Sequence, residues 1–339
     1  MTTDFKHFWY IVAESHELTK NIVLSRQVCD EWLVCYRDSQ GKATVMRDRC
    51  LHRCGKLSDG SVSQGILKCS YHGWLYGEAG KVVAIPSMGN TMTDNLKGRT
   101  YLTREQEGYI YVRLMDNGDD LQPFAMPYYQ KSGWKNIRLQ NDFQNTLSNC
   151  VENFIDIPHT AFVHKGIFRS SRNEAIRAEI KRMNGQVHVT YANEKQNLGS
   201  FNWFLNPRGR PIVHTDSYFM PNITFVSYSL ESKWQYVITS QSVPVSAEHT
   251  KVYTEISFRF GLLTPFIGWL VKRQGQKVID QDIQVLNQQM RVIKKYGSHF
   301  YDTPCDTIHT SVSEIINALY AKQDPTLLPD QRHEVTFRV

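Results

Sequence analysis

Long hydrophobic runs are missing from this chain. The most apolar stretch, residues 260–271, is 12 residues long and is interrupted by Pro265 and Gly268. A helix that spans a bilayer needs about 20 apolar residues, so this stretch is too short. The first residues, Met-Thr-Thr-Asp-Phe-Lys, also lack the apolar core of a secretory signal. We therefore expect a cytoplasmic protein with no membrane span.

The chain also lacks a large excess of charge of one sign and an even number of cysteines. The formal net charge is +6 over 339 residues, of which 41% are hydrophobic and 21% charged. This balance is that of a globular protein, and the positive charge is too small and too dispersed for a surface that binds nucleic acid. The chain has seven cysteines, an odd number. Without a secretory signal, metal-binding or free thiols are expected rather than a framework of disulfides.

The first 122 residues predict a small β domain. They contain short runs of aromatic and β-branched residues between polar breaks, which is the pattern of β-strands. The runs are residues 8–12, 32–36, 43–46, 74–76, 81–85 and 109–112. A polar, turn-rich stretch at 116–120 and the prolines of residues 123–127 then indicate a boundary. We predict two domains, residues 1–122 and residues 123–339.

The second domain is predicted to be an antiparallel sheet with a few helices. Apolar residues recur at helical spacing from Asn145 until Pro158 disturbs the pattern. The pair Asn184-Gly185, between two strand-like runs, is typical of a type I′ hairpin. Further strands are expected at residues 213–228, 234–243 and 250–260. The pair Thr264-Pro265 then indicates the start of a helix that continues to about Lys295, which gives an α+β fold.

Two mixed pairs of cysteine and histidine lie in the first domain. One residue separates Cys50 from His52, and Cys69 and His72 follow after 16 intervening residues. Two thiolates and two imidazoles are the ligands of a Rieske-type [2Fe–2S] centre, where cysteines hold one iron and histidines the other. A tetrahedral zinc site uses the same donor atoms and is the alternative. Zinc sites, however, usually pair cysteine with cysteine and histidine with histidine.

These two segments resemble those of a known family. Residues 50–60, C-L-H-R-C-G-K-L-S-D-G, and residues 69–74, C-S-Y-H-G-W, are similar to the signature of the Rieske non-haem iron oxygenases. The resemblance implies that the two cysteines bind one iron of the cluster and the two histidines the other. It also implies an N-terminal all-β Rieske domain and a C-terminal catalytic domain with a helix-grip fold.

A second candidate metal site follows about a hundred residues later. Asp156, His159 and His164 offer two imidazoles and a carboxylate, which suit a facial triad that holds Fe(II) with positions open for dioxygen. Two histidines at this spacing are by themselves more often structural. The Rieske-like segment upstream changes the interpretation, because a one-electron carrier in the same chain would supply the electrons that an oxygen-activating iron needs.

The run of residues 152–166 resembles the catalytic-iron motif of the same family. The resemblance implies that both histidines of the run are iron ligands and that Asp156 is not. Asp156 would instead hydrogen-bond to His159 and, across a subunit boundary, to His72 of a neighbouring subunit, which would give electrons a short path between the two centres. Asn153 is a weaker candidate for a polar residue that lies next to the iron ligands without binding the iron.

The third iron ligand is expected late in the chain. Residues 281–289, Q-D-I-Q-V-L-N-Q-Q, resemble the segment that supplies this ligand in the monooxygenase branch, which implies Asp282. Gln281 departs from the family, which usually has Glu at that position, and Asp280 is an alternative ligand. Residues two apart on a helix point about 200° apart, so only one of the two aspartates can face the iron. Asp282 shares a face with the apolar Leu286, whereas Asp280 suits a solvated face.

Together these features predict the terminal oxygenase component of a Rieske monooxygenase system. The expected cofactors are one [2Fe–2S] cluster and one mononuclear Fe(II), with dioxygen as co-substrate. No G-x-G-x-x-G fingerprint follows a strand, so NAD(P)H is expected to act only through a separate flavin reductase, with or without a ferredoxin. The expected reaction is hydroxylation, or oxidative N- or O-demethylation, of a small ring-containing molecule. The resemblance also implies a homotrimer.

Three other interpretations stay open at this point. An aromatic-ring dioxygenase would catalyse cis-dihydroxylation, but the short chain and the late aspartate resemble the monooxygenase branch. A pure electron carrier would need only the first domain and would leave the second unexplained. A zinc-stabilised ligand-binding module is compatible with a helix-grip fold and would be colourless when purified.

Overall fold

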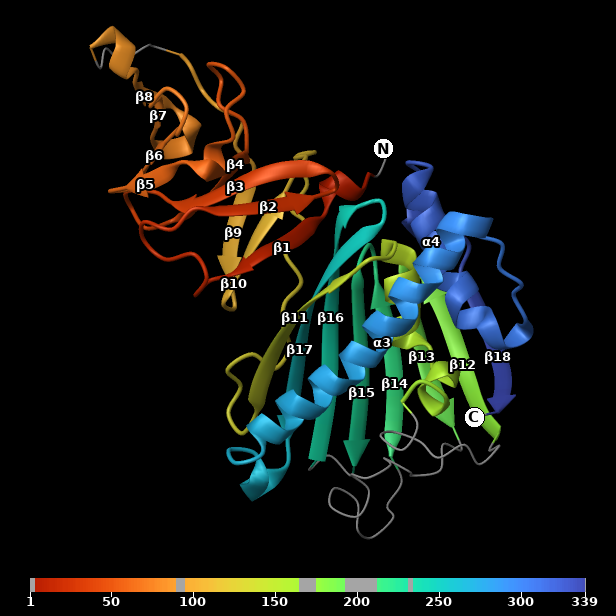
Figure 1. The fold of residues 1–339 in the computed structure, drawn as a ribbon. Helices are drawn as coiled ribbons and strands as arrows, with labels where there is room; N and C mark the ends of the chain where they lie inside the picture. Colours follow the sequence, from red (N-terminus) through yellow and green to blue (C-terminus); the bar gives the residue numbers. More distant parts are fainter. Residues whose placement is uncertain (1–3, 90–94, 165–174, 193–211, 231–233, 339) are drawn as a thin grey trace. The chain divides into compact units, whose positions relative to one another are not determined.

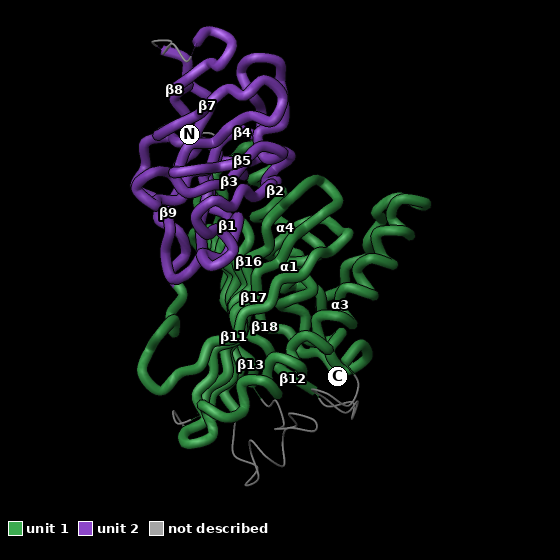
Figure 2. The backbone as a smooth tube through the Cα atoms, turned by 60° about the vertical axis from the view of Figure 1, so that its left-hand side comes forward, with its two compact units in different colours: residues 1–4, 126–339 green, residues 5–125 purple. Residues whose placement is uncertain are grey.

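The structure, a computed structural model, describes residues 4–89, 95–164, 175–192, 212–230 and 234–338. The chain divides into one unit of residues 5–125 and a second unit of residues 126–339 together with residues 1–4 (Figure 2). Each unit has its own buried core. The domain boundary predicted after residue 122 stays a prediction.

The unit of residues 5–125 is built from small antiparallel sheets. In spatial order their strands are β1 (Trp9–Glu14), β10 (Tyr109–Arg113) and β9 (Leu102–Gln106); β2 (Leu24–Val28), β3 (Glu31–Arg37) and β4 (Ala43–Arg47); and β5 (Ser61–Ser63), β6 (Ile66–Lys68), β7 (Leu75–Tyr76) and β8 (Val82–Ala84). Each of the six runs predicted as strands overlaps one of these elements. The core includes Val34, Leu67 and Tyr76, all fully buried.

The second unit contains an eight-stranded antiparallel sheet. In spatial order its strands are β11 (Lys135–Phe143), β17 (His249–Arg259), β16 (Trp234–Ser246), β15 (Ile223–Leu230), β14 (Val213–Phe219), β13 (Gln186–Ala192), β12 (Ala175–Met183) and β18 (Gln331–Arg338). Burial alternates along β14, where His214, Asp216 and Tyr218 are buried and the residues between them are more exposed. This alternation is expected when one face of a sheet is covered.

Helices cover one face of this sheet (Figure 1). They are α1 (Leu147–Ile155), α3 (Gly268–Tyr296) and α4 (Thr307–Tyr320). Leu139, Phe258 and Ile279 are buried in the core of this unit, and burial of each such side chain contributes roughly 1.5–3 kcal/mol. The predicted α+β architecture is therefore confirmed. Among the described residues, no helix is both long and apolar enough to cross a membrane.

The long helix α3 lies very close to the sheet at Gly275. A Cβ atom at this position would be 2.6 Å from Ile256 Cδ1 and 3.4 Å from Leu139 Cδ1. A larger residue would therefore displace the Ile256 side chain from its present position. The absence of a side chain at Gly275 allows Ile256 and Leu139 to pack directly against α3.

The turn between β12 and β13 is the predicted hairpin. Met183 pairs with Gln186, so Asn184 and Gly185 form a two-residue loop. The backbone angle φ is +50° at Asn184 and +69° at Gly185, and a type I′ turn requires positive φ at both positions. A Cβ at position 185 would also lie 2.4 Å from Met220 Sδ. Glycine is needed here both for its φ and for space.

One predicted strand is interrupted. Within residues 213–228, β14 ends at Phe219 and β15 begins at Ile223. The turn residues Pro221 and Asn222 are buried. Proline and asparagine both favour turns, and a proline disfavours a continuous strand, so the pair Pro221-Asn222 marks this turn in the sequence although the prediction left it out.

The long helix begins later than predicted, at Gly268 rather than at the pair Thr264-Pro265. The Thr264 hydroxyl accepts a hydrogen bond from Phe260 N (2.8 Å) and donates one to Gly261 O (2.9 Å). Thr264 thus stabilises the turn that precedes the helix instead of capping the helix itself.

Gly185→Ala tests the hairpin. We expect a loss of at least about 1 kcal/mol in the free energy of unfolding, because alanine disfavours positive φ and its Cβ meets Met220. Thermal unfolding should show a melting temperature lower by about 2–4 °C or more. The matched control, Asn184→Gly, keeps the positive φ without strain and should not lower the melting temperature. Equal stability of the alanine variant and the wild type would contradict the turn geometry.

Candidate active site

The four residues predicted to bind the cluster meet on two loops of the first unit. Cys50 and His52 follow β4, and Cys69 and His72 follow β6. Both cysteines are buried, and the centroids of the two imidazoles lie 4.5 Å apart. His52 Nδ1 is buried and makes no hydrogen bond within the described part of the chain. A buried ring nitrogen without a partner, beside two thiols, fits a metal ligand.

The two loops share one backbone pattern. Cys50 N donates to the carbonyl oxygen five residues later (2.8 Å), and the Cys50 carbonyl accepts from the amide four residues later (3.1 Å). The second loop repeats both bonds around Cys69, at 2.9 and 3.1 Å. The fourth residue after the cysteine has positive φ in both loops, +56° at Cys54 and +71° at Gly73. The exposed Cys54 therefore occupies the backbone position that glycine occupies in the other loop.

The surroundings of Cys69 disfavour a free thiolate. Burial raises the pKa of the Cys69 thiol. Tyr76 OH accepts a hydrogen bond from Leu51 N (2.9 Å) and lies 3.1 Å from Cys50 Sγ, to which it can donate its hydrogen. Burial raises the pKa of Tyr76, so this hydroxyl stays protonated. A metal ion that supplies positive charge would stabilise the thiolate form of Cys69 in these surroundings.

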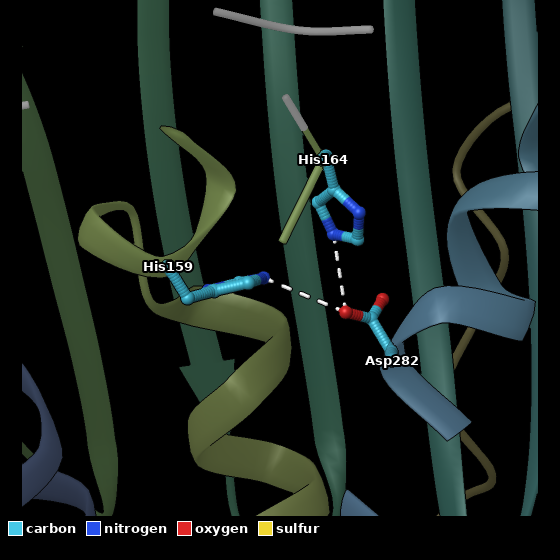
Figure 3. Close-up of side chains that lie close together, drawn as sticks. All are labelled: His159, His164 and Asp282. Carbon is cyan, nitrogen blue, oxygen red and sulfur yellow. Dashed lines mark ion pairs between the residues drawn. The ribbon is translucent and has the colours of Figure 1, made fainter. Parts of the chain in front are cut away.

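Three further predicted ligands come together in the second unit (Figure 3). His159 lies in the short helix η5 (Pro158–Ala161), His164 follows it, and Asp282 lies on α3. Asp282 Oδ1 is 3.1 Å from His164 Nε2 and 3.6 Å from His159 Nε2. One possible ligand atom from each residue lies within 4.8 Å of the others. Asp280, the alternative ligand, is exposed and hydrogen-bonded along α3, outside this group.

Two acceptors fix the tautomers of the histidines. His159 Nδ1 is 3.0 Å from Asp156 Oδ2, and His164 Nδ1 is 3.0 Å from Gln281 Oε1. Carboxylate and amide oxygens only accept, so each Nδ1 carries the hydrogen and donates it. Each neutral ring then keeps its Nε2 lone pair, and both Nε2 atoms lie beside Asp282 Oδ1. That oxygen is buried and accepts no hydrogen bond of normal geometry from the described residues.

Both Nε2 atoms and Asp282 Oδ1 therefore lie next to one another, an arrangement that positive charge between them stabilises. Burial lowers the pKa of His164, but its contact with the charged Asp282 raises it more, so its pKa lies above the usual value. The site thus stabilises positive charge, either a proton or a metal ion. Two imidazoles and one carboxylate with positions left open are the donor set of non-haem Fe(II).

Asp156 has a second histidine neighbour. It follows the last residue of α1, and its Oδ1 atom lies 3.6 Å from His309 Nε2 on α4. Burial raises the pKa of Asp156, but its contacts with His159 and His309 outweigh burial and lower the pKa, so the carboxylate stays ionised. No pattern in the sequence pointed to His309, which lies far along the chain outside any motif. Residues 165 and 166, which end the predicted motif, lie outside the described residues.

Asn145 holds the ligand-bearing segments at a fixed separation. Its buried side chain donates to two groups of α3, Leu286 O (2.6 Å) and Gln289 Oε1 (3.0 Å). Its side-chain oxygen accepts from Thr146 N, at the start of α1 (2.8 Å). Because the two histidines follow α1 and the aspartate lies on α3, this one amide connects both sides of the site.

A cavity of about 120 Å³ adjoins the three ligands, and Asn153 lies in its wall. Asn153 Oδ1 is buried and has no hydrogen bond among the residues described. The side chains that the sheet contributes form rows across neighbouring strands, each row with its own chemistry. They are a hydroxyl row of Thr224, Ser240 and Thr254, an apolar row of Val226, Ile238 and Ile256, and an aromatic row of His214, Tyr228 and Tyr236.

Two family descriptions match this chain. Residues 8–101 match the Rieske [2Fe-2S] domain. Residues 143–321, more than half of the chain, match the Vanillate O-demethylase oxygenase C-terminal domain. The first match contains all four predicted cluster residues, and the second contains both histidines and the late aspartate.

Individual relatives share less than a third of their residues with this chain. Methylxanthine N1-demethylase NdmA of Pseudomonas putida is 29% identical over 264 residues, which cover 73% of this chain and 71% of that protein. Chlorophyllide a oxygenase of Arabidopsis thaliana is 24% identical over 323 residues, which cover 88% of this chain but 54% of that protein.

Solved structures share the fold. The structure of NdmA with caffeine has a TM-score of 0.80 at 23% identity and covers 97% of this chain and 96% of that chain. Dicamba monooxygenase bound to dicamba has a TM-score of 0.82 at 19% identity and covers 94% of this chain and 98% of that chain. These likenesses support the two-part architecture.

Variants of the two aspartates test the metal site. Asp282→Ala should lose mononuclear iron and turnover, because it removes the only carboxylate of the described group. It should keep a red-brown cluster spectrum, which Cys50→Ala should abolish. Metal analysis and visible absorbance measure both effects. The matched control is Asp280→Ala on the same helix, which should retain iron. Loss of iron in the control but not in Asp282→Ala would contradict the assignment, and so would a wild-type protein that holds zinc without iron.

Proposed function

This chain belongs to the Rieske non-haem iron oxygenases, and from that membership we propose that it is the terminal oxygenase of a demethylase-type monooxygenase system. The enzymes of this family carry a [2Fe–2S] cluster and a mononuclear iron and use dioxygen. The observation that carries the proposal is the group of two Nε2 atoms and one carboxylate oxygen beside an apolar and aromatic cavity. Such a group can hold iron next to a bound organic molecule.

We assign the cofactors to named residues. Cys50 and Cys69 would hold one iron of the cluster, and His52 and His72 the other. The mononuclear iron would be held by the two histidines and the aspartate drawn in Figure 3. The buried, unpartnered atoms at both sites support these assignments. We also retain the division into a Rieske domain, residues 1–122, and a catalytic domain, residues 123–339.

The side chains around the mononuclear site orient its ligands before the metal binds. When bound, the iron supplies the activation of dioxygen. Asp156 and Gln281 accept the Nδ1 hydrogens of the histidines and so direct both Nε2 lone pairs to one point. The apolar side chains of Val226, Ile238 and Ile256 line the same cavity and exclude water from the space that a substrate would occupy. The substrate is therefore held where its reacting carbon is shielded from solvent.

The reaction that we propose is oxidative removal of a methyl group. Insertion of one oxygen atom into a C–H bond of an N- or O-methyl group gives a hemiaminal or hemiacetal, which releases formaldehyde and leaves N–H or O–H. The second oxygen atom leaves as water, formed with two electrons and two protons. The demethylase names of the matched family and of NdmA support this outcome over cis-dihydroxylation.

The electrons would come from a separate redox partner. We propose a flavin reductase, with or without a ferredoxin, as the donor to the cluster, and a cytoplasmic location where NAD(P)H is present. We further propose a homotrimer arranged head to tail, a heterologous interface closed by threefold rotation. In that arrangement Asp156 contacts His72 of the neighbouring subunit. The side chain of Asp156 is 18% exposed in the isolated chain, so it is accessible for such a contact.

Oxygen uptake tests the proposed reaction. Purified enzyme with a surrogate reductase and NADH should consume dioxygen and release one formaldehyde per methylated molecule converted. We expect this stoichiometry because one methyl carbon is removed in each turnover. A screen of methoxy- and N-methyl-substituted single-ring compounds would measure it. Formation of a cis-diol without formaldehyde would contradict the demethylase proposal.

Asp156→Asn tests the proposed electron route. Both metals should stay bound, because Asp156 ligates neither. Turnover should fall by about 10–100-fold or more, because an amide is neutral and its NH2 group cannot accept the hydrogen of an imidazole. The cluster should still be reduced by its donor, which single-turnover kinetics can measure. The control Asp280→Asn removes an exposed carboxylate and should turn over normally. A fully active Asp156→Asn variant, or a fully active enzyme that is monomeric by light scattering, would contradict the route.

A further inference from the structure

An ion pair behind the iron ligands joins two helices of the second unit. Asp156 follows the last residue of α1, and its Oδ1 atom faces Nε2 of His309, in the first turn of α4, at 3.6 Å. The two helices pack against each other. His309 is not one of the three metal ligands and does not line the cavity beside them. Its position so close to the site therefore requires another explanation.

Neither charge of this pair suits its place on its helix. Negative charge is favourable near the N-terminus of a helix, and positive charge near the C-terminus. Asp156 lies at the C-terminal end of α1, whereas His309 is the third residue of α4. Each charge alone would destabilise its own helix, so helix stability does not account for the pair. The contact between the two side chains offsets both unfavourable positions.

Both ring nitrogens of His309 face a carboxylate. Nε2 faces Asp156, and Nδ1 is 4.0 Å from Asp306 Oδ1. Only the positively charged imidazolium has a hydrogen on both nitrogens. Burial lowers the pKa of His309, but its contact with Asp156 and the charges of Glu152 and Asp306 raise it more, so its pKa lies above the usual value. The ring is thus suited to donate toward Asp156.

The ring of His309 is also held from the side opposite Asp156. The second oxygen of Asp306 accepts hydrogen bonds from Thr303 N (2.8 Å) and Thr303 Oγ1 (2.7 Å). This capping box fixes Asp306 immediately before α4 begins. The imidazole therefore lies between a carboxylate fixed at the start of α4 and the carboxylate at the end of α1.

The two oxygens of Asp156 have different partners. Oδ2 accepts hydrogen bonds from His159 N (3.1 Å) and His159 Nδ1 (3.0 Å). Oδ1 faces His309. Partners on both oxygens restrict rotation of the carboxylate about its Cβ–Cγ bond. Since Asp156 directs the ring of His159, the orientation of that ring depends on His309 as well.

We propose that His309 is a positioning residue of the iron site, which holds Asp156 through Oδ1 and thereby keeps Nε2 of His159 directed at the metal. It touches neither the metal nor the substrate and acts only through Asp156. The inference rests on the proposed function, because it presupposes the mononuclear iron. Loss of the direct partner of a metal-binding histidine costs about 10–100-fold in metal affinity. His309 is one residue farther away, so we expect an effect at the lower end of this range.

Iron release from the holoenzyme tests the inference without a substrate. Reduced holoenzyme is mixed anaerobically with the ferrous chelator ferrozine, whose coloured complex reports iron loss, and the absorbance of the cluster shows that the cluster stays intact. His309→Leu is similar in size but cannot donate, so it should lose mononuclear iron about tenfold faster than the wild type. His309→Gln has an amide that can donate to Asp156, so it should stay within about threefold of the wild type. Rates that do not depend on chelator concentration show that dissociation is measured.

The matched control is Ser313→Ala. Ser313 lies one turn after His309 on α4 and donates to Glu152 Oε1 at 2.5 Å, so the change removes a contact between the same two helices without touching Asp156. This variant should release iron at the wild-type rate. In an Asp156→Asn background, His309→Leu should have little further effect, because two residues that act through one contact are not additive. If His309→Leu does not fold, as judged by thermal unfolding, His309→Asn, whose amide is too short to reach Asp156, should show the faster release.

Three results would overturn the inference: iron release from His309→Leu or His309→Asn at the wild-type rate, equally fast release from His309→Gln, or a full additional effect in the Asp156→Asn background. An enzyme that contains iron and releases formaldehyde but shows one of these results would contradict this inference alone. An enzyme that shows the expected order of release rates but converts no methylated molecule would contradict the proposed function alone. A wild-type protein without mononuclear iron would contradict both.

Discussion

The structure of the second unit depends on one electrostatic constraint. Two imidazole Nε2 atoms and one carboxylate oxygen converge, and their lone pairs repel one another unless a proton or a metal ion lies between them. In a buried site, repulsion among these atoms is poorly screened. The arrangement is maintained because Asp156 and Gln281 hold the opposite side of each imidazole and because a cation can occupy the centre. The residues that do not touch the metal are therefore as necessary to the site as those that do.

Rigid packing keeps this unfavourable group together. The ligands come from the end of α1 and from the middle of α3, two helices that lie on one face of a wide sheet. Gly275 allows α3 to approach the sheet, and the amide of Asn145 connects α3 to the start of α1. A shift of about 1 Å between these helices would separate the ligand atoms. The hydrophobic core beneath α3 thus supplies the free energy that the metal site itself lacks when the metal is absent.

The same sheet organises the cavity by the regularity of its strands. Because side chains alternate between faces and strands align in register, residues of one chemical type form rows across the cavity wall. The hydroxyl row and the aromatic row are separated by the row of Val226, Ile238 and Ile256, to which β14 adds the buried carboxylate of Asp216. A substrate with one reactive end and one polar end would be oriented by this gradient. The orientation would determine which carbon is presented for oxidation.

Local sequence determined the features whose parts are close along the chain. The Cys/His pairs lie within two short loops, both histidines of the second site lie within one motif, and Asn184-Gly185 forms its turn without help from the rest of the protein. In each of these cases a few residues set both the spacing and the backbone angles, so the pattern is readable. The turn at Pro221 and Asn222 was missed, although both residues favour turns, because strand-like residues lie directly on both sides of the pair.

Only the tertiary structure decided which distant residues are neighbours. Helical geometry showed that Asp280 and Asp282 cannot both face the histidines, but the position of α3 on the sheet placed Asp282 beside them. His309 reaches Asp156 because α4 packs near α1, and Gln281, a departure from the family, becomes the partner of His164. His214 and Asp216 lie in the cavity wall because β14 is an inner strand with its buried face toward the helices. Contacts between residues far apart in sequence depend on how whole elements pack, and no local pattern encodes that packing.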